Sequence, residues 1–256
     1  MTRAGEKAFR QAASRRGRRK TGLSLCEGRR CCSELLRRSP QIIEMVLLAD
    51  TCDKPELRVR CESLSCPVET VPETTIAKLA TTENPQGILA LFQIPRTSPL
   101  ETPPADPFLL VLDGLADPGN LGTILRTAWA VGLRQACLTE GTVDPHAPKT
   151  LRAGMGAQFA LELHRTPSLP DIAAKLEQWH WGPLWLTVPR GGVSAFSVDF
   201  TLHRSALVIG GEARGVSDPT TGRPVSLPMP GDAESLNAAQ AATVFLFEAV
   251  RRQLLQ

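Results

Sequence analysis

Three polar residues near the C-terminus, Glu212, Ser235 and Asn237, have types and positions that suit hydrogen bonding to a bound ligand. Glu212 directly follows Gly210 and Gly211, a pair that allows a tight turn and lets a ligand approach the backbone closely. Ser235 and Asn237 precede a long apolar-periodic run, which predicts a helix with Ser235 as its cap. Polar groups on loops that a rigid core holds are typical of a binding site. The structural alternative is a turn and a helix cap without a ligand.

A second polar loop, over residues 113–126, carries Asn120 and Arg126. Pro118 and Gly119 predict a turn, and Asn120 is the expected N-cap of a helix that continues to about residue 131. Arg126 would lie on the first turn and a half of that helix, from which it can reach back toward the loop. The alternative for Arg126 is a solvated surface arginine.

Alternating strand and helix patterns after residue 107 would position both loops. Strands are predicted at 108–112, 135–139, 159–163, 184–188 and 207–209, with helices at 120–131, 148–153, 170–179 and 238–255. This alternation predicts an α/β fold with a mostly parallel sheet and helices on both faces. Ligands bind at the carboxyl ends of such strands, and both polar loops leave such ends, so we expect one shared site. Pro219, Pro224, Pro228 and Pro230 predict neither a regular helix nor a central strand between Glu212 and Ser235.

The N-terminal part of the chain predicts a small, separate α/β domain. Residues 1–21 form an expected basic arm or helix, followed by strands at 23–25, 45–48, 68–71 and 88–92 and helices at 28–38 and 72–79. Five prolines then fall within residues 95–107, which is typical of a stiff interdomain linker. The expected division is an arm at 1–21, a small domain at 22–94, a linker at 95–107 and a larger domain at 108–256.

Charge is distributed unevenly over the 256 residues. The net charge of +3 combines +9 in residues 1–38, with twelve basic against three acidic side chains, and −6 in the remainder. A basic end on an acidic body suggests contact with a polyanion, most simply a nucleic acid. The alternative is a solvated or disordered tail. With 42% hydrophobic residues the chain has enough for a sizeable core, and no apolar run approaches the roughly 18 residues of a membrane span, so no membrane partner is expected.

Cysteine usage favours a reducing compartment. Six of the seven cysteines lie within the first 66 residues, without a C-x-x-C pair and far in sequence from the four histidines. This spacing does not predict a zinc site, and we expect no metal. No apolar stretch typical of a secretory signal follows the basic N-terminus, so free thiols in the cytoplasm are expected. An Arg-rich transit peptide is the alternative.

Three ordered motifs resemble those of the SpoU/TrmH branch of the SPOUT RNA methyltransferases. They are Asp113-Gly-x-x-Asp-Pro-Gly-Asn-x-Gly-x-x-x-Arg126, Ile209-Gly-Gly-Glu-x-x-Gly215 and Leu227-Pro-Met-x-Gly-x-x-x-Ser-Leu-Asn237. Asp144-Pro-x-x-Pro-Lys-x-x-Arg-Ala153 is similar to the segment between the first two motifs, and the N-terminal part is similar to a ribosomal-protein-like RNA-binding domain. The resemblance implies methyl transfer from S-adenosylmethionine to a ribose 2′-hydroxyl of RNA. It also implies a C-terminal trefoil knot and a homodimer.

The resemblance also assigns roles to individual residues. Catalytic positions of the family fall on Asn120, Arg126, Glu212, Ser235 and Asn237. Cofactor contacts fall on Gly210, Leu227, Leu236, Met229 and Thr187. Trp129, Gly154 and the run 238–241 depart from the usual pattern, which leaves the subfamily and the substrate open.

Several functions remain open at this point. The two-domain layout favours ribosomal RNA as the substrate over transfer RNA. An antibiotic-resistance rRNA methyltransferase of the same family is equally compatible with the motifs. A non-catalytic RNA-binding or ribosome-assembly protein is disfavoured, because the complete polar set is present. A Rossmann nucleotide-binding enzyme is disfavoured too, because 210–215 lacks the G-x-G-x-x-G spacing and opens a proline-rich loop.

Overall fold

The computed structural model describes residues 1–255 and divides into two compact units. The first comprises residues 1–96 and 144–160, and the second comprises residues 97–143 and 161–255. Gln256, the last residue of the expected larger domain, lies outside the described residues. None of the helices within residues 1–255 is long and apolar enough to cross a membrane.

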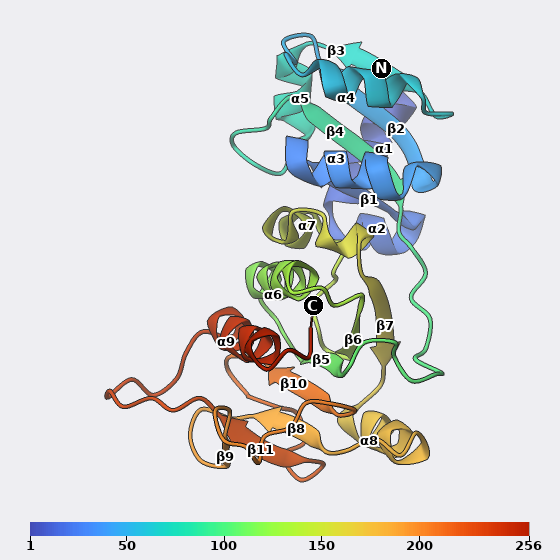
Figure 1. Ribbon diagram of the computed structural model, residues 1–256. Helices are drawn as coiled ribbons and strands as arrows, with labels where there is room; N and C mark the ends of the chain where they lie inside the picture. Colours follow the sequence, from blue (N-terminus) through green and yellow to red (C-terminus); the bar gives the residue numbers. More distant parts are fainter. Residues whose placement is uncertain (256) are drawn as a thin grey trace. The chain divides into compact units, whose positions relative to one another are not determined.

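The first unit is a four-stranded sheet in the order β1-β4-β2-β3, flanked by helices (Figure 1). β4 is antiparallel to β1 and β2, whereas β2 and β3 are parallel. The expected helix at 28–38 is confirmed, and its apolar face, Cys31, Cys32, Leu35 and Leu36, is buried. The α-helices and strands are α1 (Arg3–Ala13), α2 (Arg15–Thr21), β1 (Leu23–Glu27), α3 (Arg29–Arg38), β2 (Ile43–Ala49), α4 (Pro55–Glu62), β3 (Val68–Val71), α5 (Glu73–Leu79), β4 (Ile88–Gln93) and α7 (Pro148–Gly154).

Two segments pack differently from the expected domain division. The expected N-terminal arm folds as α1 and α2 within the first unit, with Phe9 fully buried. Residues 144–160, expected in the larger domain, also belong to this unit. Arg18 Nε donates to Asp144 Oδ2 at 2.8 Å, and Leu151 is part of the unit's core. Sequence proximity could not reveal this, because the contacts join residues more than 120 positions apart.

The second unit is a seven-stranded sheet in the order β7-β6-β5-β10-β8-β11-β9, and every strand pair in it is parallel (Figure 1). The predicted parallel sheet is therefore confirmed. Alternate residues of its strands face opposite sides of the sheet. Val111 and Val208 pack in one hydrophobic cluster with the buried face of α8. The helices α6 and α9 contact each other. The elements are β5 (Leu109–Asp113), α6 (Pro118–Ala130), β6 (Gln135–Thr139), β7 (Glu162–Thr166), α8 (Leu169–Gln178), β8 (Leu184–Thr187), β9 (Val193–Ser194), β10 (Ala206–Gly210), β11 (Arg223–Ser226) and α9 (Ala238–Arg251).

Both expected helix caps near the polar loops were wrong. α6 begins at Pro118, and its N-cap is Asp117, whose Oδ1 accepts from the backbone N–H of Asn120 at 2.8 Å. α9 is capped by Asn237, whose Oδ1 accepts from Ala239 N at 2.9 Å, and not by Ser235. Asp and Asn are strong N-caps, so the residue nearest the first helical turn takes the role in each case. The side chains of Asn120 and Ser235 are therefore not used for helix capping.

The proline-rich segment contains a strand that the sequence did not predict. β11 lies between β8 and β9, although Pro224 is within it. β9 pairs only with Val225 and Ser226, so that β8 is the one partner strand of Pro224. Proline is tolerated there because Pro224 has a partner strand on one side only, so its missing N–H costs no ladder bond to a second strand.

An ionic cluster anchors the end of α9. Arg251 and Arg252 donate to the Glu248 carboxylate at 2.6–2.7 Å, and these hydrogen bonds, Arg251's foremost, lower the pKa of Glu248 to about 2. Arg252 also donates to the carbonyls of Ala195 and Ser197 at 2.8 and 2.9 Å. The helix is thereby tied to the segment that follows β9.

Candidate cofactor and active site

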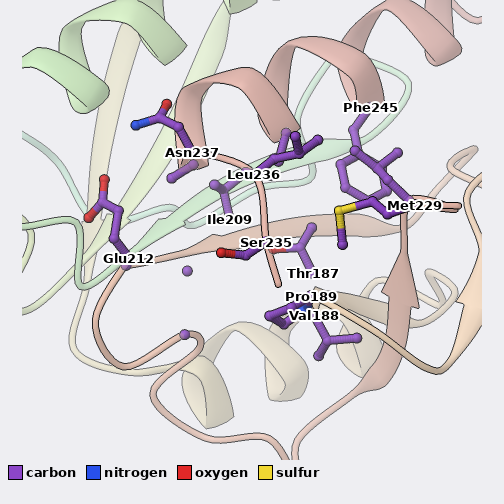
Figure 2. A pocket seen from close by; sticks show the side chains of 16 residues that line it. Thr187, Val188, Pro189, Ile209, Glu212, Met229, Ser235, Leu236, Asn237 and Phe245 are labelled. Carbon is purple, nitrogen blue, oxygen red and sulfur yellow. The ribbon is translucent and has the colours of Figure 1, made fainter. Parts of the chain in front are cut away.

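A cavity of about 280 Å³ lies at the carboxyl ends of β8 and β10 (Figure 2). Parallel sheets bind ligands at these ends, because the loops that follow neighbouring strands meet there. The lining comes from the loops after β8, β10 and β11 and from one face of α9. The lining residues are Thr187, Val188, Pro189, Ile209, Gly210, Gly211, Glu212, Gly215, Leu227, Met229, Ser235, Leu236, Asn237, Ala238, Ala241 and Phe245.

All five residues expected to contact a cofactor line this cavity: Gly210, Leu227, Leu236, Met229 and Thr187. Figure 2 shows Met229 and Phe245 together at one end, with Glu212 and Asn237 at the other. The Thr187 hydroxyl donates to the Val208 carbonyl at 2.8 Å, so it braces the two strands. Apolar side chains and glycine backbone make up most of the wall, which suits a ligand with a flat apolar ring held through main-chain groups.

A chain of hydrogen bonds joins three of the five expected catalytic residues. Asn237 Nδ2 donates to Asn120 Oδ1 at 3.0 Å, and Asn120 Nδ2 donates to Glu212 Oε1. The three side chains come from the starts of α9 and α6 and from the loop after β10. The side-chain oxygen of Asn237 accepts from the backbone amides of Ala239 and Gln240, so the Asn237 Nδ2 is left to donate. This fixes which group donates and which accepts along the chain of hydrogen bonds. The cluster holds a carboxylate at the edge of the cavity.

The other two expected catalytic residues, Ser235 and Arg126, lie outside this chain of hydrogen bonds. Ser235 lines the cavity and is exposed, with its hydroxyl directed into it in Figure 2. Arg126 is exposed on α6 and does not line the cavity. Because α6 begins at Pro118, Arg126 lies beyond the second turn, about 9 Å along the axis from Asn120. Its side chain makes no hydrogen bond or ion pair with any residue in 1–255, and it is free to meet a bound molecule.

The glycines of the β10 loop allow very close backbone packing. Gly211 and Gly215 exchange two backbone hydrogen bonds of 3.0 and 2.8 Å, which close a tight turn directly after β10. A Cβ atom on Gly210 would stand 2.4 Å from the carbonyl carbon of Gly215. A Cβ on Gly211 would stand 2.7 Å from the carbonyl oxygen of Gly114. Both positions therefore need glycine for the turn itself, and the turn is what brings Glu212 to the cavity.

A buried carboxylate ties this loop to the sheet. Asp113, at the end of β5, is 1% exposed, and its oxygens accept from Ser217 N at 2.6 Å, Ser217 Oγ at 3.1 Å and Thr139 Oγ1 at 2.6 Å. Ser217 follows the glycine turn by two residues. Asp113 thus holds the far end of the loop that carries Glu212. This role was not predicted from the sequence, although Asp113 opens the polar loop at 113–126.

Replacing Asp113 with asparagine should loosen the cavity. The new amide NH₂ would face a donor, leaving a buried group unpaired, and we expect unfolding free energy to fall by about 1–3 kcal/mol. Ligand affinity should fall as well, because the turn loses its anchor. Urea unfolding and calorimetric titration of the ligand measure the two effects. Asp199→Asn, an exposed carboxylate in the same unit, is the matched control and should change neither.

The loop after β8 is the part of the cavity that the sequence analysis missed. Val188 and Pro189 line the cavity, and Arg190 Nη2 donates to the carbonyls of Gly231 and Ala233 at 3.2 and 2.9 Å. These bonds connect the loop after β8 with the segment that leads to α9. The signal was present, because residues 189 and 190 directly follow the predicted strand at 184–188.

Comparisons with known proteins agree with this geometry. Residues 107–247, more than half of the chain, match the model of the SpoU rRNA Methylase family, and residues 7–90 match the MRM3-like substrate binding domain. The chain is 37% identical to a tRNA/rRNA methyltransferase of Synechocystis, covering 96% of this chain and 90% of the relative. It is 31% identical to a 23S rRNA (guanosine-2′-O)-methyltransferase of Bacillus subtilis, covering 94% of each. An AdoMet-bound rRNA methyltransferase from Sinorhizobium meliloti superposes with a TM-score of 0.82 at 28% identity, covering 100% of this chain and 97% of that one.

Proposed function

The chain belongs to the SpoU rRNA methylase family, and we propose that it transfers a methyl group from S-adenosylmethionine to a ribose 2′-hydroxyl of ribosomal RNA. The observation that carries the proposal is the hydrogen-bonded chain from Asn237 through Asn120 to Glu212 at the edge of an apolar cavity. The named 23S rRNA substrate of the B. subtilis relative supports ribosomal RNA as the acceptor.

The cavity fits S-adenosylmethionine by its chemistry. We propose that Leu227, Leu236 and Met229 enclose the adenine ring and that backbone groups near Gly210 bind its polar edge. Thr187 would brace the wall beside it through its bond to Val208. When bound, the cofactor supplies an electrophilic sulfonium methyl group, so the protein needs only to place and activate the acceptor.

Positioning of the ribose is the first task of the polar residues. Asn120 and Glu212 hold each other through Asn120 Nδ2, which leaves the second carboxylate oxygen of Glu212 to accept from a ribose hydroxyl or from Arg126. Ser235 offers a hydroxyl from the opposite loop. Fixing two reacting groups in line lowers the barrier by several kcal/mol, up to roughly 7–11 in the best cases.

Charge stabilisation is the second task, which we assign to Arg126. A hydroxyl is a weak nucleophile until a partner takes or shares its proton, and guanidinium keeps its own proton at ordinary pH. We propose that Arg126 binds the adjacent phosphate through its planar fork and stabilises the negative charge that develops on the 2′-oxygen, while the hydroxyl proton passes to water or to that phosphate. Its lack of partners within residues 1–255 leaves the fork available.

The proposal is tested by methylation of RNA in vitro. Purified protein and methyl-labelled S-adenosylmethionine should label a large-subunit rRNA transcript and not a transfer RNA transcript. The modified position should resist alkaline cleavage, which requires a free 2′-hydroxyl. Labelling of the transfer RNA alone would move the substrate assignment to that RNA, and base methylation without cleavage resistance would contradict ribose as the acceptor.

Three finer features complete the proposal. We propose that the path from β8 through α9 forms a trefoil knot, which the family resemblance and the ties from Arg190 to Gly231 and Ala233 support. We propose a homodimer, supported by the exposed Val244 and Phe247 on α9. We also propose a cytoplasmic location, supported by the free state of the seven cysteines and the bacterial relatives. Residues 22–94 would act as the substrate-binding domain, with 95–107 as linker and 108–256 as the methyltransferase domain, although residues 1–21 and 144–160 fold within the first unit.

A further inference from the structure

A second cavity, of about 350 Å³, lies in the first unit. It is formed where β1 meets α3, by the loop that precedes β4 and by the end of α7, and its lining includes Glu27, Arg30, Asn84, Arg152 and Met155. Its volume is within the range of about 300–1,000 Å³ that small-molecule sites occupy. None of the residues assigned to methyl transfer takes part in it.

The inner wall of this cavity is polar but close to neutral. The Glu27 side chain is fully buried, and its carboxylate accepts from Thr81 N at 2.9 Å, from the Thr81 hydroxyl and from Arg152 Nη1. The Arg152 side chain remains 31% exposed, so part of its guanidinium reaches the cavity. A phosphate placed inside would meet the Glu27 carboxylate. A neutral heterocycle with both donors and acceptors suits this wall better.

The rim of the cavity offers groups that nothing in the protein uses. Arg30 and Asn84 are exposed, and neither side chain makes a hydrogen bond or ion pair with any residue of the described chain. The neighbouring Arg29 differs, because Asp53 and the Gln86 carbonyl engage its guanidinium. A free guanidinium beside a neutral pocket suits the phosphate of a nucleotide whose base lies inside.

Met155, which lines this cavity, has an unusual backbone conformation. Its φ of 51° is in the left-handed region, which favours glycine, and it ends α7 while its side chain lines the cavity. Glycine at this position would suit the backbone better. The methionine side chain therefore supplies something other than local stability, and with Cys31 it gives the cavity an apolar wall against which a base can lie.

Among its described residues, the first unit has no exposed aromatic ring that could stack on a base. Its phenylalanines Phe9 and Phe92 are fully buried, and Phe159 packs edge-on against Phe92. None of the large hydrophobic side chains exposed within residues 1–96 and 144–160 is aromatic, so stacking on an exposed ring is not available to it. Hydrogen-bonding groups are then a main means of recognising bases, and the cavity gathers several of them.

We propose that this cavity binds one unpaired nucleotide of the RNA substrate, with the base against Glu27, Arg152 and Met155 and the phosphate at Arg30. The inference rests on the proposed function, since it assigns a role in selecting the RNA that is methylated. Single-stranded loops can present such a base, because their bases can be splayed out of the stack.

Steady-state methylation of a large-subunit rRNA transcript tests the proposal. The double variant Arg30→Ala/Asn84→Ala should raise KM for the RNA about tenfold, with kcat at saturating RNA and the affinity for S-adenosylmethionine unchanged. Arg60→Ala, another exposed arginine of the same unit outside the cavity, is the matched control and should stay within about twofold of the wild type. An equal KM for the double variant and the control would overturn the proposal.

Met155→Gly separates recognition from stability. The substitution relieves the left-handed backbone, so the unfolding midpoint should not fall markedly, yet KM for the RNA should rise. In parallel, a transcript containing 4-thiouridine should cross-link to the peptides that carry residues 28–31 or 152–155. Cross-links confined to other peptides, while the wild type still methylates the RNA, would reject the cavity and leave the proposed function intact. Failure of the wild type to methylate, with cross-links at the cavity, would reject the function instead.

Discussion

Gly210→Ala should weaken binding of S-adenosylmethionine by about one to two orders of magnitude. The added methyl would stand 2.4 Å from the Gly215 carbonyl carbon and 2.6 Å from its oxygen and from Val216 N, which are all backbone atoms. The turn must therefore move, and overpacking of this kind costs about 1–3 kcal/mol. Gly210 and Gly215 both line the cavity, so the displacement alters the wall directly. Isothermal titration calorimetry of the purified variant measures the loss.

A matched glycine provides the control for this result. A Cβ on Gly231, in the segment before α9, would meet nothing within 4 Å, so Gly231→Ala should bind S-adenosylmethionine as the wild type does. Circular dichroism and thermal unfolding should show that both variants fold. Equal affinities for the two variants would mean that the cavity beside Gly210 is not the cofactor site.

Arg126→Ala should lower kcat for RNA methylation by about 10²–10³-fold, the effect typical of removing one donor that stabilises developing negative charge. Affinity for S-adenosylmethionine should stay the same, because Arg126 does not line the cofactor cavity. Arg126→Lys isolates the geometry of the group, since lysine keeps the positive charge but loses the planar fork. We expect the lysine variant to recover only a small part of the activity. Single-turnover methylation at saturating RNA measures the chemical step without the contribution of binding.

Arg223→Ala is the control for the arginine substitution. Arg223 is an exposed arginine of the same unit on β11, outside the lining of the cavity, and its loss should leave kcat unchanged. Near-normal methylation by Arg126→Lys would show that charge alone is required and would remove the special role of the guanidinium. An unchanged kcat in Arg126→Ala would exclude Arg126 from the reaction.

Much of the fold could be predicted from the sequence, because strand patterns are local. The apolar runs at 135–139 and 207–209 correspond to β6 and β10, and the helix at 148–153 corresponds to α7. The prediction was less accurate for short strands and for helices whose apolar residues lack a helical period. The strand expected at 159–163 lies at Glu162–Thr166, since Phe159 instead ends a short 3₁₀ turn and packs in the other unit. α4 was missed, because its apolar residues do not follow a helical period.

The family resemblance assigned five residues to the cofactor, and all five line the cavity. Residue patterns alone predicted only the edge of the sheet, because the loops at the carboxyl ends of parallel strands meet there. The caps were predicted wrongly, because several residues near each helix start can accept from its amides and only the three-dimensional path of the entering chain selects one. Asp117 and Asn237 took the roles expected of Asn120 and Ser235.

Most strands of the parallel sheet, the two polar loops and the edge of the sheet at which they meet could be predicted from the amino-acid sequence. These features depend on periodicity and on the rule for parallel strands, both of which can be read along a single chain. The contacts between side chains, in contrast, became known only from the folded chain. The bonds from Asn237 to Asn120 and from Asn120 to Glu212 span 117 and 92 positions, and those from Ser217 to Asp113 span 104. Such contacts follow from the neighbouring places of β5, β10 and β8 in the sheet, an order that no local pattern contains.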